Sequence, residues 1–196
     1  MITVRQLERL WQEKAFSRMS ALLLEMRPES SLRLVHELAR AVPVAALSII
    51  RLDELSQAHT SFCARMIRTI LAGQEQDWGF GDPLTSALCI RALSCSNGHG
   101  MAIERGLKYL ASLQKEDGSW PRIPLRRFGG DAFVTALVLY HLGENEKFIE
   151  ATRAEAALDW LSAQEAEMDP ETARVFRLVR TRLAQAPLRE PSFSWS

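Results

Sequence analysis

The stretch 105–120 reads RGLKYLASLQKEDGSW and runs from an apolar helical segment into a loop with Asp, Gly and Trp. Forty positions before Gln114 (114 − 74 = 40), the chain reads QEQDWGFGD from Gln74 to Asp82. In both places a glutamine follows a helical segment and precedes Asp, Gly and Trp. Glycine permits turn geometry that residues with a Cβ resist, so both stretches are typical of loops between helices.

The segments that follow the two loops also begin alike. One reads DPLTSA from Asp82 and the other DAFVTA from Asp131, 49 positions later (131 − 82 = 49). A third segment, WLSAQEAEMDPETARVFRLV (160–179), keeps the plan but lacks the Gly and Trp of the loop. A repeat of this length with two helices per unit predicts stacked or circularly arranged helical hairpins.

The rest of the chain also has helical periodicity, and no stretch alternates as a half-buried strand does. We therefore expect an all-α protein of roughly nine or ten helices, with one long first helix through Leu7 and Leu24. Residues 1–185 are interpreted as one helical-repeat domain, with divergent hairpins in 1–60 and recognisable repeats in 60–180. Residues 186–196 are expected to form a loosely attached C-terminal tail.

The composition narrows the classes of function. Apolar residues make up 47% of the 196 residues and the formal net charge is zero, so no overall basic field attracts nucleic acid. Three cysteines without a CxxC pair favour a reducing, cytoplasmic setting and no zinc site. The N-terminus lacks a signal-peptide pattern. The longest apolar stretch, 42–50, is too short to insert stably in a membrane.

The loop residues have ordinary structural roles. Asp82 and Asp131 each stand where a helix begins, where a carboxylate accepts hydrogen bonds from free backbone N–H groups. Helix capping thus accounts for both residues without catalysis.

The residues Arg105-Gly106, Leu110, Gln114, Gly118 and Trp120 resemble the QW motif of the prenyltransferase and squalene oxidase repeat. The resemblance covers about residues 60–180 and weakens at both ends. It implies the α/α-toroid of terpenoid cyclases and protein prenyltransferase β-subunits, here partial or open and built from about four to five hairpins. In that family the QW residues tie helices together and do not catalyse.

The chain departs from that family where its chemistry lies. Class II cyclases protonate an alkene with the middle acid of D-x-D-D-T-A. Aligned on Thr135-Ala136, Asp131 matches the first Asp, but Phe133 takes the place of the proton donor. Phe133 also replaces the cysteine of the Asp-x-Cys zinc pair of the prenyltransferases. We therefore expect no metal and no cofactor.

Two catalytic candidates remain: Asp131 is the better one, and His99, between two glycines, is weaker. A pocket for an apolar ligand could be lined by Trp78, Phe80, Asp82, Trp120, Phe128 and Phe133. The alternative is that these aromatic residues pack the interfaces between repeats.

Three hypotheses for function follow. The first is a non-catalytic module that binds a protein partner or an apolar ligand on its concave face. A ring of six hairpins needs roughly 270 residues, so an open arc of 196 would expose apolar edges and form a homodimer or bind a partner. The second is an enzyme on isoprenoid or polyprenyl substrates without the usual acidic motif. The third, a carbohydrate-active toroid, lacks a visible carboxylate pair.

Overall fold

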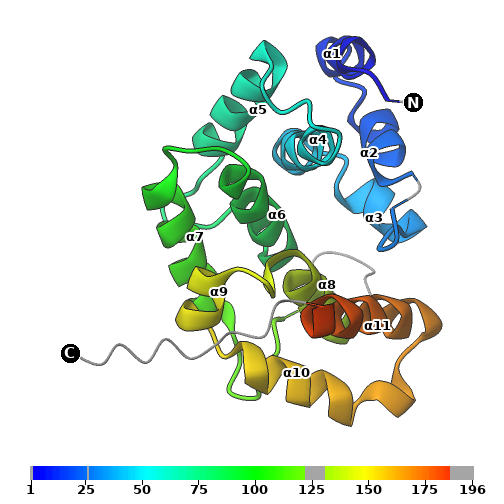
Figure 1. The fold of residues 1–196 in the computed structure, drawn as a ribbon, viewed down its shortest axis with the longest axis vertical. Helices are drawn as coiled ribbons and strands as arrows, with labels where there is room; N and C mark the ends of the chain where they lie inside the picture. Colours follow the sequence, from blue (N-terminus) through cyan, green and yellow to red (C-terminus); the bar gives the residue numbers. More distant parts are fainter. Residues whose placement is uncertain (1, 26, 122–130, 186–196) are drawn as a thin grey trace.

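The computed structural model describes residues 2–25, 27–121 and 131–185 (Figure 1). Within these ranges the chain forms eleven α-helices, one 3₁₀ helix and no strand, which confirms the predicted all-α class. Phe128 and the tail 186–196 lie outside the described residues. The elements are α1 (Val4–Gln12), α2 (Phe16–Leu24), α3 (Leu32–Glu37), α4 (Ala41–Glu54), α5 (Ser61–Ala72), α6 (Pro83–Ser94), α7 (Gly100–Leu113), α8 (Asp131–Leu142), α9 (Glu146–Ala151), α10 (Ala154–Ala163), η1 (Glu165–Glu167) and α11 (Pro170–Gln185).

The expected long first helix is wrong, because the chain breaks into α1 and α2 at Lys14. Lys14 has a left-handed φ of 51°. The backbone N–H of Lys14 donates to the Trp11 carbonyl at 3.0 Å, and that of Ala15 to the Leu10 carbonyl at 2.9 Å. These two bonds form a Schellman motif, which ends a helix by satisfying its last carbonyls.

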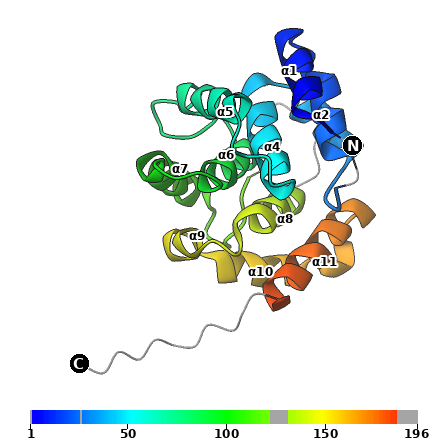
Figure 2. The same cartoon turned by 45° about the horizontal axis from the view of Figure 1, so that its top comes forward.

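Four helices form a central row in which each packs on the next: α4 on α6, α6 on α8, and α8 on α11. Four further helices pack against this row. Helix α5 packs on α4, α7 on α6, α10 on α8, and α2 on α4 (Figures 1 and 2). The residues of α6 from Pro83 to Ile90 are all buried, and so are those of α8 from Phe133 to Leu142. Consecutive helices therefore pair as α4 with α5 and α6 with α7, whereas the two helices joined by each repeated loop, α5 with α6 and α7 with α8, pack on each other much less. The toroid that the resemblance implies stays a prediction.

The loops 74–80 and 114–120 have the same internal hydrogen bonds, as the sequence repeat predicts. In each loop, the residue after the glutamine donates its N–H to a carbonyl four positions later at 2.9 Å. In each, an aspartate Oδ1 accepts the N–H of the residue two positions on, also at 2.9 Å. The corresponding pairs are Glu75–Gly79 and Lys115–Ser119 for the first bond, and Asp77–Gly79 and Asp117–Ser119 for the second.

Both loops are also fixed to the helix that follows them. Phe80 N–H donates to Ser86 Oγ at 3.1 Å, and Trp120 N–H donates to Thr135 Oγ1 at 2.9 Å. Ser86 and Thr135 are the hydroxyl residues that the DPLTSA and DAFVTA alignment places together. The two segments therefore share a pattern of hydrogen bonds as well as a pattern of residues.

The two glutamines attach each loop to a neighbouring outer helix. Gln74 Nε2 donates to the carbonyl of Ala102 in α7 at 3.1 Å. Gln114 Nε2 donates to the carbonyl of Arg153, before α10, at 3.1 Å, and its Oε1 accepts the Arg153 N–H at 2.8 Å. The glutamines thus tie consecutive hairpins together.

Candidate functional site

The predicted aromatic residues divide between the core and the surface. Trp120, Phe133 and Phe80 are buried. Trp120 donates its indole N–H to the Leu110 carbonyl at 2.8 Å and stacks on Phe148 with ring centroids 5.8 Å apart. Trp78, in contrast, is 44% exposed. An apolar pocket lined by all of these residues stays a prediction.

Asp82 caps α6, as the sequence indicated. Its Oδ1 accepts the Thr85 N–H at 2.8 Å, and its Oδ2 accepts the Thr85 hydroxyl at 2.7 Å. Arg40 Nη2, at the start of α4, lies 3.1 Å from Asp82 Oδ2 and ties the beginnings of two central helices together. Asp82 is therefore occupied by structural contacts.

Asp131, the better catalytic candidate, is the first residue of α8. Its carboxylate forms an ion pair with Lys115, the residue after the loop glutamine. Its side chain is 27% exposed, so solvent reaches it. Phe133, where the cyclases hold their proton donor, is completely buried. The chain therefore lacks the proton-donating acid that, in that family, lies two residues after the aspartate matched by Asp131.

His99, the weaker candidate, lines a small polar hollow between two turns. The hollow has a volume of about 340 Å³ and is lined from one side by Asn97 and His99 and from the other by Asn145 and Lys147. It does not include Asp131, so the structure does not bring the two catalytic candidates into one pocket. In the described residues, no group of three or more His, Cys, Asp or Glu side chains could hold a metal ion.

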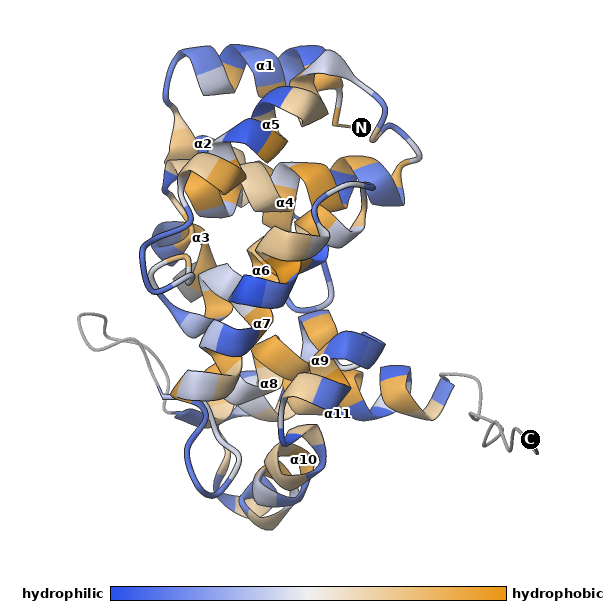
Figure 3. Cartoon of the chain, turned by 90° about the vertical axis from the view of Figure 1, so that its left-hand side faces the viewer, coloured by the Kyte–Doolittle hydropathy of each residue, from blue (hydrophilic) through white to orange (hydrophobic). Residues whose placement is uncertain are grey.

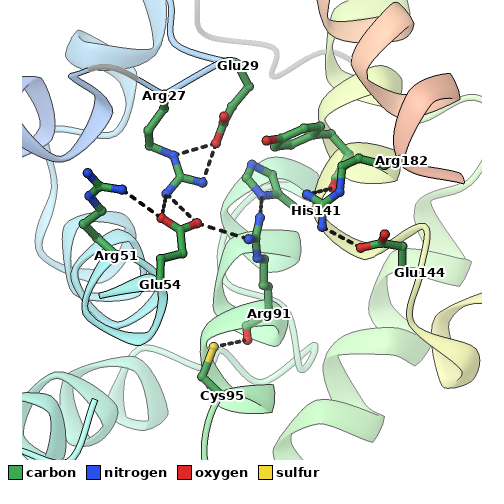
Figure 4. A network of polar contacts seen from close by, with 10 residues as sticks. Arg27, Glu29, Arg51, Glu54, Arg91, Cys95, His141, Glu144 and Arg182 are labelled. Carbon is green, nitrogen blue, oxygen red and sulfur yellow. Dashed lines mark hydrogen bonds and ion pairs between the residues drawn. The ribbon is translucent and has the colours of Figure 1, made fainter. Parts of the chain in front are cut away.

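A network of charged side chains joins the last turns of the central helices (Figure 4). Glu54, the last residue of α4, accepts hydrogen bonds from three arginines. The distances are 3.1 Å from Arg27 Nη1 to Oε2, 3.2 Å from Arg51 Nη1 to Oε2, and 3.3 Å from Arg91 Nη2 to Oε1. One carboxylate thus joins the α2–α3 connection, α4 and α6.

Arg27 and Glu29 form the buried part of this network. Their side chains are 4% and 1% exposed, and Arg27 Nε donates to Glu29 Oε1 at 2.6 Å. Glu29 Oε2 is also buried, and it accepts no hydrogen bond from the part of the chain that the structure describes. The α2–α3 connection therefore inserts an ion pair between the central helices.

The network continues through α8 to α11. Arg91 Nη1 lies 3.0 Å from His141 Nδ1. Arginine can only donate, so Nδ1 accepts and the ring carries its proton on Nε2. Arg182 donates to the Tyr140 carbonyl at 3.2 Å and to Glu144 Oε2 at 2.5 Å. Its guanidinium lies 4.8 Å from the centroid of the Tyr140 ring.

The electrostatics of this network follow from burial and from its excess of arginines. Burial, and then the positive charges of Arg91, Arg27 and Arg182, hold the pKa of His141 well below its usual 6.5. Burial and the neighbouring Arg27 and Arg182 lower the pKa of Arg91. Burial, followed by the charge of Glu29, raises the pKa of Tyr140. His141 is therefore neutral near pH 7, and its Nδ1 accepts a hydrogen bond from Arg91.

A larger groove, of about 890 Å³, lies between α2, α3 and α11. The apolar part of its lining comes from α2, α3 and the start of α11 and consists of Ala21, Leu22, Val35 and Pro170. Its charged part is Arg18, Glu25, Glu171 and Arg174. Arg174 donates to the Ser30 carbonyl and so links α11 to the α2–α3 connection.

Neither the network nor the groove was predicted from sequence. Their residues come from segments far apart in the chain, and no local motif joins them. The only local signal for the network was a charged or polar residue, Arg91 or His141, near the end of a strongly apolar helix.

No model of a protein family matches this chain. No curated protein and no solved structure matches it either. Within the described ranges, none of the helices combines the length and apolar character needed to cross a membrane.

Proposed function

We propose that the chain is a non-catalytic helical-repeat module of the terpene cyclase and prenyltransferase type, which binds an apolar ligand in the groove between α2, α3 and α11. An apolar segment of a protein partner would contact the same residues of the groove. The observation that carries the proposal is the groove itself. Its volume of about 890 Å³ lies in the range, roughly 300–1,000 Å³, of pockets that bind small molecules.

The composition of the groove supports an apolar ligand. Leu22 and Val35 are only half-buried and would lose contact with water when a ligand covers them. The charged side chains include two arginines and two glutamates, so no single sign of charge dominates.

The central residues support binding without catalysis. Protonation of an alkene needs a strong acid held against the substrate. Phe133 is a buried hydrocarbon, Asp131 is paired with Lys115, and His141 is a neutral acceptor of a hydrogen bond.

The test is ligand binding with a matched pair of variants. Farnesol, geranylgeraniol and squalene would be titrated into the protein, with thermal stability and heteronuclear NMR shifts as readouts. We expect at least one to stabilise the protein and to shift signals from α2, α3 and α11. Ala21→Glu places a charge in the groove and should abolish binding. Ala166→Glu, the same change at an exposed alanine of η1, should leave binding intact.

If none of the probes binds, or if Ala21→Glu has no effect, the apolar-ligand proposal for this groove is wrong. Shifts in the groove produced only by an apolar peptide would favour a protein partner instead.

The alternative function is an enzyme that acts on isoprenoid or polyprenyl substrates. The observation in its favour is that the Asp131 carboxylate is accessible at the start of α8. Incubation with squalene, farnesyl diphosphate and geranylgeranyl diphosphate, followed by product analysis, tests it. Turnover that is lost in Asp131→Asn would support the enzyme and contradict a non-catalytic module.

A further inference from the structure

Trp78 and Gly118 occupy the same position in the two matching loops. The N–H of each donates to a carbonyl three positions earlier at 2.9 Å, and each has a left-handed φ, of 72° and 87°. In the second loop only glycine fits, because a Cβ at position 118 would lie 2.6 Å from the backbone nitrogen of Ala157 in α10. The first loop instead carries the largest side chain in a conformation that non-glycine residues disfavour.

Burial in the monomer does not offset the unfavourable backbone conformation of Trp78, because 44% of the residue is exposed. Its ring contacts Arg105, whose guanidinium carbon lies 5.6 Å from the ring centroid. A strained backbone position with an exposed tryptophan is typical of a residue that serves a contact outside the monomer.

Trp78 belongs to an exposed apolar surface that we call the Trp78 patch, formed by Leu71, Trp78 and Met101. In the described residues these are the large apolar side chains with the greatest exposure, at 37%, 44% and 68%. Gln74 connects the loop that carries Trp78 with α7 beside Met101. It follows Leu71 by three residues, and its side-chain amide donates to the carbonyls of both Trp78 and Ala102, at 3.0 Å and 3.1 Å.

The residues of the patch belong to α5, α7 and the loop between α5 and α6, and the helices α5 and α7 lie on the side of the molecule that faces the viewer in Figure 3. Helix α7 is covered further along by α9, through direct packing contacts. The groove lies elsewhere, against α2, α3 and α11, so the patch is a separate surface.

The charged side chains around the patch are balanced and divided by element. The loop contributes the exposed acids Glu75 and Asp77. The helices contribute the exposed bases Arg68, from α5, and Arg105, from α7. Glu104 and Lys108 add one charge of each sign and pair with each other at 3.0 Å. Such a rim carries no net charge to attract a strongly acidic or basic partner.

We propose that the Trp78 patch is the interface through which two copies of this chain form a symmetric homodimer. A twofold interface buries the same surface on both copies and must be complementary to itself. Self-complementarity requires charges of both signs, and the rim provides them through the exposed acids of the loop and the exposed bases of α5 and α7. Tryptophan, methionine and arginine are also the residue types enriched at the centres of interfaces.

The test uses Trp78→Gly, which replaces Trp78 with the residue that the matching loop already carries. Sedimentation velocity would follow the full chain over a hundredfold concentration range up to about 100 μM, where dimers of moderate affinity form. We expect the wild type to shift from monomer to dimer and Trp78→Gly to weaken association by at least about tenfold. Its melting temperature, measured where both proteins are monomers, should be unchanged or higher, because the strain at position 78 is removed.

A second pair of variants covers a possible loss of folding in Trp78→Gly. Met101→Asp changes the most exposed apolar residue of the patch and should also weaken the dimer. Ala166→Asp, at an exposed residue away from the patch, should not. A wild type that stays monomeric throughout the range would overturn the proposal. A dimer that survives both Trp78→Gly and Met101→Asp would equally overturn it.

Discussion

Glu54 is the residue whose loss should most weaken the network that joins the central helices. Glu54→Gln keeps the size of the side chain but removes the one negative charge shared by Arg27, Arg51 and Arg91. Glutamine can still accept from one arginine through its carbonyl oxygen, but it turns a donor NH₂ group toward the others. Arg27 keeps its ion pair with Glu29, while Arg51 and Arg91 lose their ion pairs with Glu54.

The expected loss of stability lies between the values for buried and exposed ion pairs. Breaking a fully buried pair costs roughly 3–5 kcal/mol, whereas exposed pairs contribute about 0.2–1 kcal/mol. The Arg27 side chain is 4% exposed, but that of Glu54 is 33% exposed, so solvent screens part of the interaction. We therefore expect a loss of about 2–3 kcal/mol, intermediate between these limits. For a chain of this size, that corresponds to a fall in melting temperature of about 5–10 °C.

Urea unfolding followed by far-ultraviolet circular dichroism measures this loss. Glu104→Gln is the matched control, because Glu104 also pairs with a basic residue but on an exposed helix face. We expect that control to unfold like the wild type. The double variant Glu54→Gln/Arg91→Gln should recover part of the stability, since it removes one of the opposing positive charges. A loss below about 0.5 kcal/mol in Glu54→Gln would show that solvent screening, and not burial, governs the network.

Two further predictions concern His141 and the loop glycines. The folded chain holds the pKa of His141 well below 6.5, so the unfolded chain binds an extra proton as the pH falls through that value. Stability should therefore fall as the pH drops from 7.5 to 5.5 through this group, and urea unfolding of His141→Gln should lack that component. Gly98→Ala should cost about 1–2 kcal/mol for its left-handed backbone alone, since nothing lies within 4 Å of its new Cβ. Gly118→Ala should cost measurably more because that Cβ meets the α10 backbone, and equal losses would contradict the contact.

The helical class and the repeat were predictable because both are local. Apolar periodicity indicated the helices, and the loops 74–80 and 114–120 repeat a set of hydrogen bonds made largely between residues a few positions apart. The cap at Asp82 was predictable for the same reason. The break at Lys14 was not, since a lysine in a left-handed conformation gives no signal of the kind that glycine or proline gives.

The network could not be predicted because its members are distant in sequence. Arg27, Glu54, Arg91 and Arg182 come from four segments, and helical periodicity does not say that their side chains meet. The burial of Phe133 could not be predicted from the sequence either. Alignment showed that an acid is replaced there, but only packing shows that the replacement is a core residue.

The two sets of tertiary contacts act at opposite ends of the central helices. Before α6 and α8, the loop glutamines Gln74 and Gln114 bind the neighbouring outer helices. At the last turns, the network around Glu54 joins α4, α6 and α8 to the α2–α3 connection. The two proposed binding surfaces use side chains that these structural contacts leave exposed, Ala21 in the groove and Trp78 in the patch. Substitutions at Ala21 or Trp78 should therefore change binding in a chain that still folds, whereas substitutions at Gln114 or Glu54 should reduce binding only as far as they reduce the folded population.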